Sequence, residues 1–269
     1  MPRFKLTLEY AGTRYSGWQI QKNARTVQGE VDRAVRTVTA RTDFELYGSG
    51  RTDAGVHAVA QVAHLDVSTT LAAEILRRRL NDDLPADINV LAVERVSHRF
   101  HARHDAVARR YLYQIARRRT AFAKPFVWWV KEPIDVARMQ AAARAFVGMQ
   151  DFQSFAAKDD DGGDKSTVVL VERLDVISHG DLILISIEGS HFLWKMVRRV
   201  VGVLVEIGRG GRIHARVVGR AGEADGPGLR LVSRAGVLPR RPTGRSGGAG
   251  HAAQRGVNRV PRTRRITSP

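Results

Sequence analysis

The stretch "FELYGSGRTDAGVHAVAQVAHLDV", residues 44–67, contains two apolar alternations separated by a glycine-rich loop. Side chains on a strand point alternately to opposite faces, so these alternations predict strands at 44–47 and 61–67. The loop between them, "GSGRTDAGVHA" (48–58), holds one arginine, one aspartate and one histidine among small residues. This strand–loop–strand unit is either a charged turn or a backbone shaped to hold one carboxylate beside a substrate.

The rest of the chain, to about residue 207, alternates between short strand-like and helix-like segments. Because several strand patterns are adjacent, the order favours an α+β fold with an antiparallel or mixed sheet. An approximate strand–helix–strand–strand order occurs early and recurs loosely, which is consistent with two related halves. The predicted strands cover 4–10, 44–47, 61–67, 88–96, 110–116, 167–177 and 182–187, and the predicted helices cover 27–38, 71–80, 136–146 and 192–207.

The composition excludes several classes of site. Cysteine is absent, so the chain has no disulfide, thiolate metal site or thiol nucleophile. The N-terminal "MPRFKLTLEY" alternates as a strand does and does not resemble a secretion signal. No apolar run approaches the roughly 20 residues that a membrane-spanning helix needs. We therefore expect a soluble, cytoplasmic protein.

The net charge of +17 is concentrated toward the C-terminal end. Residues 209–269 contain 14 arginines, no lysine and two acidic residues, a net charge of +12, whereas residues 1–208 carry +5. The Arg/Gly/Pro-rich segment 211–269 lacks apolar periodicity, and we expect it to be largely disordered from about residue 215. Such a tail has two interpretations: a solvated end, or a segment that binds RNA without sequence preference.

Arg51 and Asp53 are the charged residues of the 48–58 loop. Its three glycines permit tight backbone geometry that side chains would obstruct. Arginine forms charge-assisted contacts with phosphate or carboxylate groups, and rigid strand ends are frequent supports for reactive groups. Residue types and spacing alone leave a structural turn open beside a catalytic loop.

Aromatic and basic residues coincide in "RRYLYQI" (109–115). Tyr111 and Tyr113 share one face of a predicted strand, directly after Arg109 and Arg110. Aromatic rings beside guanidinium groups suit stacking on an unstacked base. The alternative is a buried aromatic pair in the core.

Two polar clusters do not have the spacing of a metal site. Three histidines in "SHRFHARH" (97–104) lie three residues apart, but no carboxylate completes a ligand set and the neighbouring arginines would repel a cation. The acidic run "DDDGGD" (159–164) fails the ligand spacing of a calcium loop. We expect no metal at either place.

In sequence order, these segments resemble the tRNA pseudouridine synthase A family. The resemblance runs from residue 3 to about 210, and "GRTDAGVHA" is long enough to be specific. It implies two ferredoxin-like or RRM-like α/β halves, 1–105 and 106–210, around a continuous antiparallel sheet with flanking helices. The matching motifs are "YAGTRYSGWQIQ", "TVQGEVDRA", "GSGRTDAGVHA", "FHARHDAVARRYLY", "DFQSFAA", "KSTV" and "FLWKMVRRVVG".

The resemblance also implies an activity and partners. The expected reaction is the isomerisation of uridine to pseudouridine in the anticodon stem-loop of tRNA, at tRNA positions 38 to 40. The expected assembly is a homodimer with an RNA cleft, without cofactor or metal.

Carried over by position, Asp53 corresponds to the family's catalytic aspartate and Arg51 to an active-site arginine. Tyr111 corresponds to the tyrosine that stacks on the target base, and Arg198 to the basic residue that pairs with the aspartate. Charge and loop position suggest phosphate contacts for Arg14, Arg51, Arg109 and Arg110.

The chain departs from the family after residue 211. The family continues with a helix and a closing strand near the active site, but the residues here do not match that helix, and "GPGLRLV" (226–232) arrives early for the strand. We hypothesise a frameshift after about residue 211 that removed both elements; an uninterrupted reading frame on resequencing the locus would refute it. The alternative function is a catalytically impaired RNA-binding protein with an open cleft and a basic tail.

Overall fold

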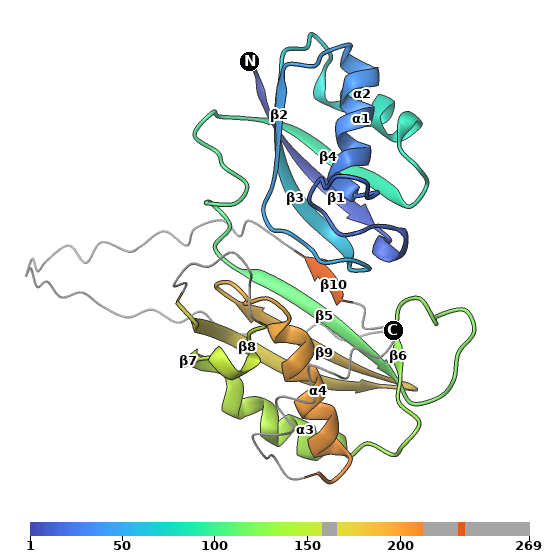
Figure 1. The fold of residues 1–269 in the computed structure, drawn as a ribbon, viewed down its shortest axis with the longest axis vertical. Helices are drawn as coiled ribbons and strands as arrows, with labels where there is room; N and C mark the ends of the chain where they lie inside the picture. Colours follow the sequence, from blue (N-terminus) through green and yellow to red (C-terminus); the bar gives the residue numbers. More distant parts are fainter. Residues whose placement is uncertain (158–165, 212–230, 235–269) are drawn as a thin grey trace, which may run out of the picture. The chain divides into compact units, whose positions relative to one another are not determined.

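The computed structural model describes residues 1–157, 166–211 and 231–234 (Figure 1). The acidic run 159–164 lies outside the described residues, as does the basic tail except for residues 211 and 231–234. No helix in the described part of the chain is long and apolar enough to cross a membrane.

The first half of the chain forms the strands and helices that its periodicity predicts, except that the strand predicted at 61–67 begins at His57. Alternate side chains of β1 are buried, as expected for a strand with one face on a core. Thr26 caps the first helix, because its hydroxyl accepts a hydrogen bond from the Gly29 amide at 3.2 Å. The elements are β1 (Arg3–Tyr10), the 3-10 turn η1 (Gly12–Arg14), α1 (Val27–Thr39), β2 (Phe44–Gly48), β3 (His57–Val67), α2 (Ala73–Asp83) and β4 (Ile88–Val96).

The second half differs from expectation at its last helix. α4 begins at Met196, four residues after the predicted start, because Lys195 has a left-handed backbone with φ of +61°. The four preceding residues therefore form a loop, with consequences for the site described below. The elements are β5 (Arg109–Ala116), β6 (Trp128–Trp129), α3 (Val136–Ala143), η2 (Arg144–Phe146), β7 (Gly148–Asp151), η3 (Gln153–Phe155), β8 (Val168–His179), β9 (Leu182–Gly189) and α4 (Met196–Gly208).

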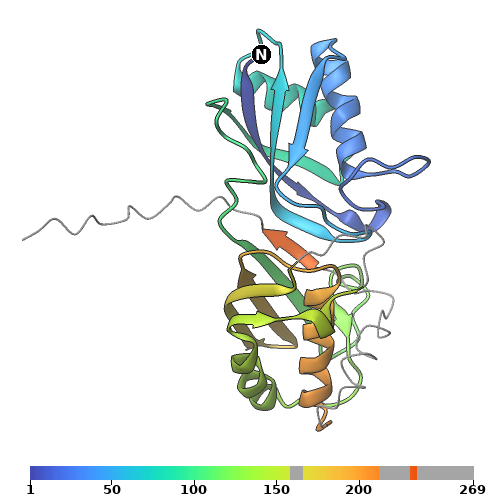
Figure 2. The ribbon, with the colours of Figure 1, turned by 60° about the vertical axis from the view of Figure 1, so that its left-hand side comes forward.

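The described strands form one sheet in the order β4-β1-β3-β10-β5-β9-β8-β7, with β2 paired to β3 and β6 to β5 (labelled in Figure 1 and turned in Figure 2). β10 (Leu231–Arg234) lies between β3 and β5, parallel to the first and antiparallel to the second. The other pairs along this path are antiparallel. The α+β class is confirmed. The strand that follows the Asp53 loop and the strand that carries Tyr111 are neighbours of the same four-residue strand.

β10 corrects one expectation about the tail. The frameshift hypothesis predicts that the closing strand is absent. Residues 231–234 nevertheless form a strand, in which Val232 pairs with His57 of β3 and with Leu112 of β5. The catalytically impaired RNA-binding alternative assumed a cleft left open by the loss of this strand, and it loses that premise. The other residues of the tail that were expected to be disordered lie outside the described ranges.

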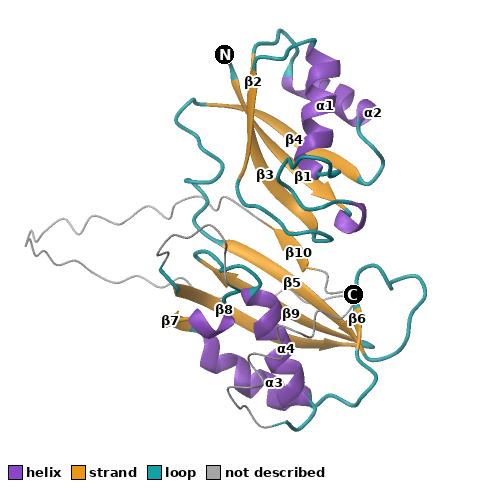
Figure 3. Ribbon diagram, viewed as in Figure 1, coloured by secondary structure: helices purple, strands orange, loops and turns teal. Residues whose placement is uncertain are grey.

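Two hydrophobic clusters fill the described structure, one in each half. Figure 3 shows α1 and α2 beside the strands of the first half, and α3 and α4 beside those of the second. Val56, which directly precedes β3, is buried in the second cluster rather than the first. The loop that contains Asp53 is therefore anchored at its end by the core of the other half.

Candidate active site

The loop between β2 and β3 is fixed by backbone hydrogen bonds at several points. The Ser49 amide donates to the Val62 carbonyl at 2.8 Å, and the Gln61 side-chain amide donates to the Gly50 carbonyl at 2.8 Å. The Val56 amide donates to the Asp53 carbonyl at 3.2 Å, which closes a tight turn on Asp53. Asp53 thus projects from a backbone with little freedom, half-buried between two strand ends.

The segment after β1 packs directly against this loop. The Trp18 amide donates to the Thr52 carbonyl at 3.0 Å, and the Gly55 amide donates to the Tyr15 carbonyl at 3.2 Å. Gly17 has a φ of +94°, and a Cβ placed there would lie 2.5 Å from the Thr52 carbonyl oxygen. Only glycine permits this approach, so "YSGWQ" serves as a support for the loop.

A hydroxyl pair lies beneath the same loop. The Tyr10 and Thr52 hydroxyls are 2.8 Å apart and both side chains are buried. Burial raises the pKa of Tyr10 above its ordinary value, so the phenol is neutral and donates or accepts without charge. This pair holds the residue next to Asp53 in place.

A cavity of about 390 Å³ brings together three residues that the family resemblance assigned to one site. Asp53 comes from the loop, Tyr111 from β5 and Arg198 from the first turn of α4, and all three line this cavity. Arg51 and Arg103 line it as well. Among the described residues that line it, Asp53 is the one with a carboxylate.

The two tyrosines of β5 have different environments. Tyr113 is buried in the second cluster, with 1% of its surface exposed. Tyr111, two residues earlier on the same face, is half-buried and meets the Phe192 ring edge-on, with centroids 5.2 Å apart at 79°. The core interpretation of this motif therefore applies to Tyr113. Tyr111 lines the cavity instead, and its stacking on a base stays a prediction.

Arg198 is positioned by the apolar face of its helix. Met196, Val197 and Val200 are buried in the second cluster. The left-handed Lys195 and a hydrogen bond from the Met196 amide to the Leu193 carbonyl, at 3.0 Å, turn the chain into α4. The turn places Leu193 and Trp194 on the cavity wall, where the expected helix would have continued through them.

Three of the four arginines predicted to contact phosphate do not line the cavity that contains Asp53. Arg109 lines a neighbouring cavity, but its guanidinium donates to the carbonyls of Ser49 at 3.0 Å and Ser190 at 2.8 Å. Burial lowers the pKa of Arg109. Arg110 pairs with Glu188 instead, and neither Arg110 nor the exposed Arg14 lines the cavities described here.

Arg103 is the cation that sequence reasoning left out of the site. It is exposed and lines both cavities, as Arg51 does. Within the described residues, neither guanidinium group forms a hydrogen bond or an ion pair, so both are available to an anion. Arg103 lies within "FHARHDAVARRYLY" (100–113), one of the motifs that carry the family resemblance, so the sequence already contained a reason to consider it.

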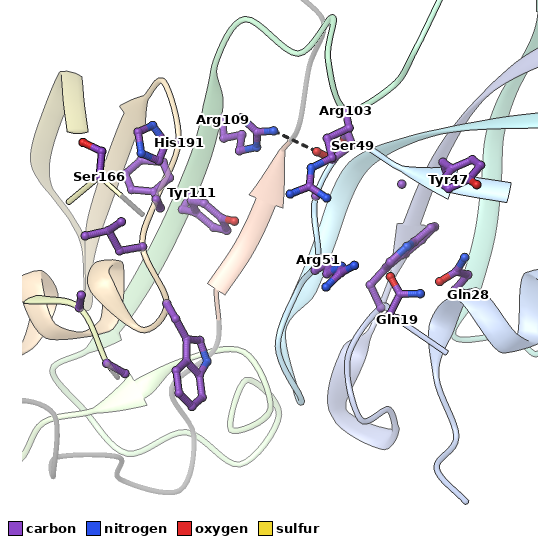
Figure 4. A pocket seen from close by; sticks show the side chains of 18 of the residues that line it. Gln19, Gln28, Tyr47, Ser49, Arg51, Arg103, Arg109, Tyr111, Ser166 and His191 are labelled. Carbon is purple, nitrogen blue, oxygen red and sulfur yellow. Dashed lines mark hydrogen bonds between the residues drawn. The ribbon is translucent and has the colours of Figure 1, made fainter. Parts of the chain in front are cut away.

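A second, larger cavity of about 860 Å³ adjoins the first (Figure 4). The two share six residues, which form a common wall. Figure 4 shows Arg51 and Tyr111 extending into this space from the loop after β2 and from β5. No group of three or more histidines or acidic residues among the described residues is arranged to hold a metal ion. The shared residues are Arg51, Arg103, Tyr111, Phe192, Leu193 and Trp194.

Comparison with known proteins gives consistent matches. A family profile described as tRNA pseudouridine synthase matches residues 7–105 and 142–228. The chain is 43% identical over 213 residues to a protein named tRNA pseudouridine synthase A from Nitrobacter hamburgensis, covering 78% of this chain and 86% of that protein. It is 42% identical over 215 residues to the protein of the same name from Brucella ovis, covering 78% and 84%.

A solved structure titled "Crystal Structure of a Cbf5-Nop10-Gar1 Complex" matches with a TM-score of 0.31 at 9% identity, over 75% of this chain and 54% of that one. The ranges that the family profile matches contain Arg51, Asp53, Arg103 and Arg198 and exclude Tyr111.

Proposed function

Because the chain belongs to the tRNA pseudouridine synthase family, we propose that Asp53 is its catalytic residue in the isomerisation of uridine to pseudouridine. The substrate is tRNA, and the reaction takes place in the anticodon stem-loop without a cofactor. The observation that supports the role of Asp53 is its place in a cavity that it shares with Tyr111 and Arg198.

The reaction replaces an N-glycosidic bond by a C-glycosidic bond and needs no oxidant or reductant. The bond between uracil N1 and ribose C1′ breaks, and a bond between uracil C5 and C1′ forms. C5 loses its hydrogen as a proton and N1 gains a proton, so the atoms balance. An ionised Asp53 starts the reaction either by adding to C1′ or by removing a ribose proton to give a glycal.

The target uridine must leave its stack before Asp53 can reach the sugar. Tyr111 replaces the neighbouring bases, because its ring lines the cavity and is steadied at its edge by Phe192. Stacking of a base on an aromatic side chain contributes about 1–3 kcal/mol, which offsets much of the cost of unstacking.

Cations around the carboxylate complete the site. Arg198 supplies a positive charge that stabilises the ionised Asp53, since both line one partly enclosed cavity. Arg51 and Arg103, whose guanidinium groups have no polar partner in the described structure, bind backbone phosphates next to the target.

The finer points of assembly and location are also proposals. The family resemblance supports a homodimer and a cytoplasmic location. Light scattering of the purified chain tests the dimer, and a monomeric mass at micromolar concentration would contradict it. Fractionation of cells tests the location, and recovery with the membrane fraction would contradict it.

The function is tested with tRNA carrying tritium at C5 of uridine. Asp53→Ala removes the carboxylate and is expected to abolish tritium release while tRNA binding stays close to that of the parent chain. Glu188→Gln is a matched control, because it also removes a carboxylate but lies outside both cavities. Turnover by Asp53→Ala near the parent rate would remove Asp53 from its role.

A further inference from the structure

The larger cavity extends beyond the residues that surround Asp53. Its volume of about 860 Å³ is more than twice that of the Asp53 cavity, and neither Asp53 nor Arg198 lines it. It is within the range of about 300–1,000 Å³ that is typical of ligand sites. Arg51, Arg103 and Arg109 line it, and their positive charges suit the space to an anion.

One wall of this cavity carries the aromatic ring of Tyr47, whose orientation is fixed by packing against two histidine rings. Tyr47, at the end of β2, is 49% exposed and lines the cavity. Behind it the ring stacks on His64, with centroids 5.3 Å apart and planes at 24°, and His101 lies tilted 6.0 Å away. A ring supported in this way loses little freedom when a second ring stacks on it.

His64 is a rigid, uncharged support for Tyr47. It is 1% exposed, and its Nδ1 accepts a hydrogen bond from the Ala102 amide at 3.2 Å. Burial, with a smaller effect of the Arg3 cation, lowers the pKa of His64 to about 4. The imidazole is therefore neutral at physiological pH, and Tyr47 does not stack on a charge that would have to be solvated.

The same side of the cavity offers a side-chain amide that is free to bind a ligand. Figure 4 shows Gln19 and Gln28 on the same side of the cavity as Tyr47. The Gln28 amide is occupied, because it donates to the Leu46 carbonyl at 2.9 Å and accepts from the Ile20 amide at 3.3 Å. The Gln19 amide has no hydrogen bond within the described residues and lines the cavity. An amide presents both a donor and an acceptor, which matches the edge of a nucleobase.

We propose that this cavity is a second nucleotide subsite, in which an unpaired nucleotide near the target uridine stacks on Tyr47. Gln19 binds the edge of its base. Arg51 and Arg103, on the wall shared by the two cavities, bind the phosphates between the two nucleotides. The inference rests on the proposed function, because it requires an RNA strand whose target uridine occupies the Asp53 cavity.

A single-stranded RNA fits this cavity better than a small anion. A phosphate alone would use the arginines but would leave the supported ring and the free amide without a partner. A single-stranded nucleotide uses all three features, because aromatic stacking and phosphate contacts are the usual means of binding unpaired bases. The two cavities then bind two nucleotides of one strand.

The test uses anticodon stem-loop RNA with 2-aminopurine placed in turn at each loop position. Binding is measured with Asp53→Asn in the background, so that no turnover occurs. We expect one position other than the target to be quenched on binding, and Tyr47→Ala to abolish that quenching. The loss of one stack, about 1–3 kcal/mol, predicts a dissociation constant raised roughly 5- to 100-fold.

Two controls separate stacking from folding. Tyr47→Phe keeps the ring and is expected to bind as the parent does. Phe122→Ala removes an aromatic ring that is 97% exposed and lines neither cavity, so it is expected to have no effect. Each variant is checked for an unchanged thermal transition. Unchanged affinity and quenching in Tyr47→Ala would overturn the subsite.

Turnover distinguishes this proposal from the one before it. With Asp53 present, Tyr47→Ala is expected to raise KM while kcat at saturating RNA stays the same. An active Asp53→Asn chain would overturn the role of Asp53 and leave the binding result for Tyr47 unaffected. Tight binding of free mononucleotides that depends on Tyr47, with no such dependence for RNA, would contradict the RNA assignment.

Discussion

The guanidinium of Arg109 donates a hydrogen bond to the Ser49 carbonyl at 3.0 Å, across 60 residues of sequence. Arg109 belongs to β5, the strand of Tyr111, whereas Ser49 belongs to the loop that carries Asp53. A second hydrogen bond from the same guanidinium reaches the Ser190 carbonyl at 2.8 Å, after β9. One side chain therefore joins three segments around the cavities, and we propose that Arg109 positions the Asp53 loop rather than binding a phosphate.

Arg109→Lys is expected to lower kcat more than it weakens tRNA binding. An ammonium group cannot donate to both carbonyls in the geometry of a guanidinium, so the Asp53 loop would shift relative to Tyr111. A displacement of about 1 Å costs on the order of 100-fold in rate. Single-turnover kinetics and filter binding measure the two effects separately. A large loss of affinity with kcat unchanged would instead indicate a phosphate contact.

Arg103→Gln is expected to weaken tRNA binding at low salt and to reduce the salt dependence. Removing one arginine that binds a phosphate reduces the slope of log affinity against log salt by about 1. Arg110→Gln is the matched control, because Arg110 pairs with Glu188 and lines neither cavity. The measurement is the tRNA affinity of both variants and of the parent chain at several salt concentrations. Equal slopes for Arg103→Gln and the parent would exclude the phosphate role.

Gly17→Ala is expected to lose activity and about 1–3 kcal/mol of stability. The left-handed backbone is strained for alanine, and the new Cβ would meet the Thr52 carbonyl beside Asp53. Gly180→Ala is the control, since Gly180 has a φ of +55° but open space around its Cβ position. It should lose stability through backbone strain and keep its kcat. Urea unfolding and tritium release together separate the two variants; normal turnover by Gly17→Ala would show that the loop does not need this support.

Stability is expected to fall as the pH is lowered from about 6.5 toward 4, because of His64. The pKa of His64 is about 4 in the folded chain and near its ordinary value of 6.5 when unfolded, so only the unfolded state gains a proton in this window. Above the window both states are neutral and His64 contributes no pH dependence. Lowered pKa values of His101 and His191, caused first by burial, act in the same direction.

Urea unfolding at several pH values measures this slope. His64→Asn retains an acceptor for the Ala102 amide but does not titrate, so its stability should vary less between pH 6.5 and 4 than that of the parent. An identical slope in both chains would remove His64 as a cause.

Local patterns in the sequence predicted most of the secondary structure. Thr26 before an apolar periodicity marked the start of α1, and Ile88–Val96 is a strand with the predicted bounds. Capping and alternation are decided by residues a few positions apart, so the sequence contains them directly. The long motif around Asp53 was specific enough to indicate the family, which the profile and the relatives then showed.

The tertiary structure decided which residues of each motif face the site. Tyr111 lines a cavity and Tyr113 is buried; Arg103 is available to a ligand, while Arg109 is bound to two carbonyls. The partners of Arg109 are 60 and 81 residues away, so no local spacing predicts them. The loop before α4 likewise depends on one left-handed backbone at Lys195, which helical periodicity does not reveal. Most elements and the family were predictable from the sequence, because both depend on short-range order. The surroundings of individual cations and rings were not, because they depend on contacts made only when distant segments fold together.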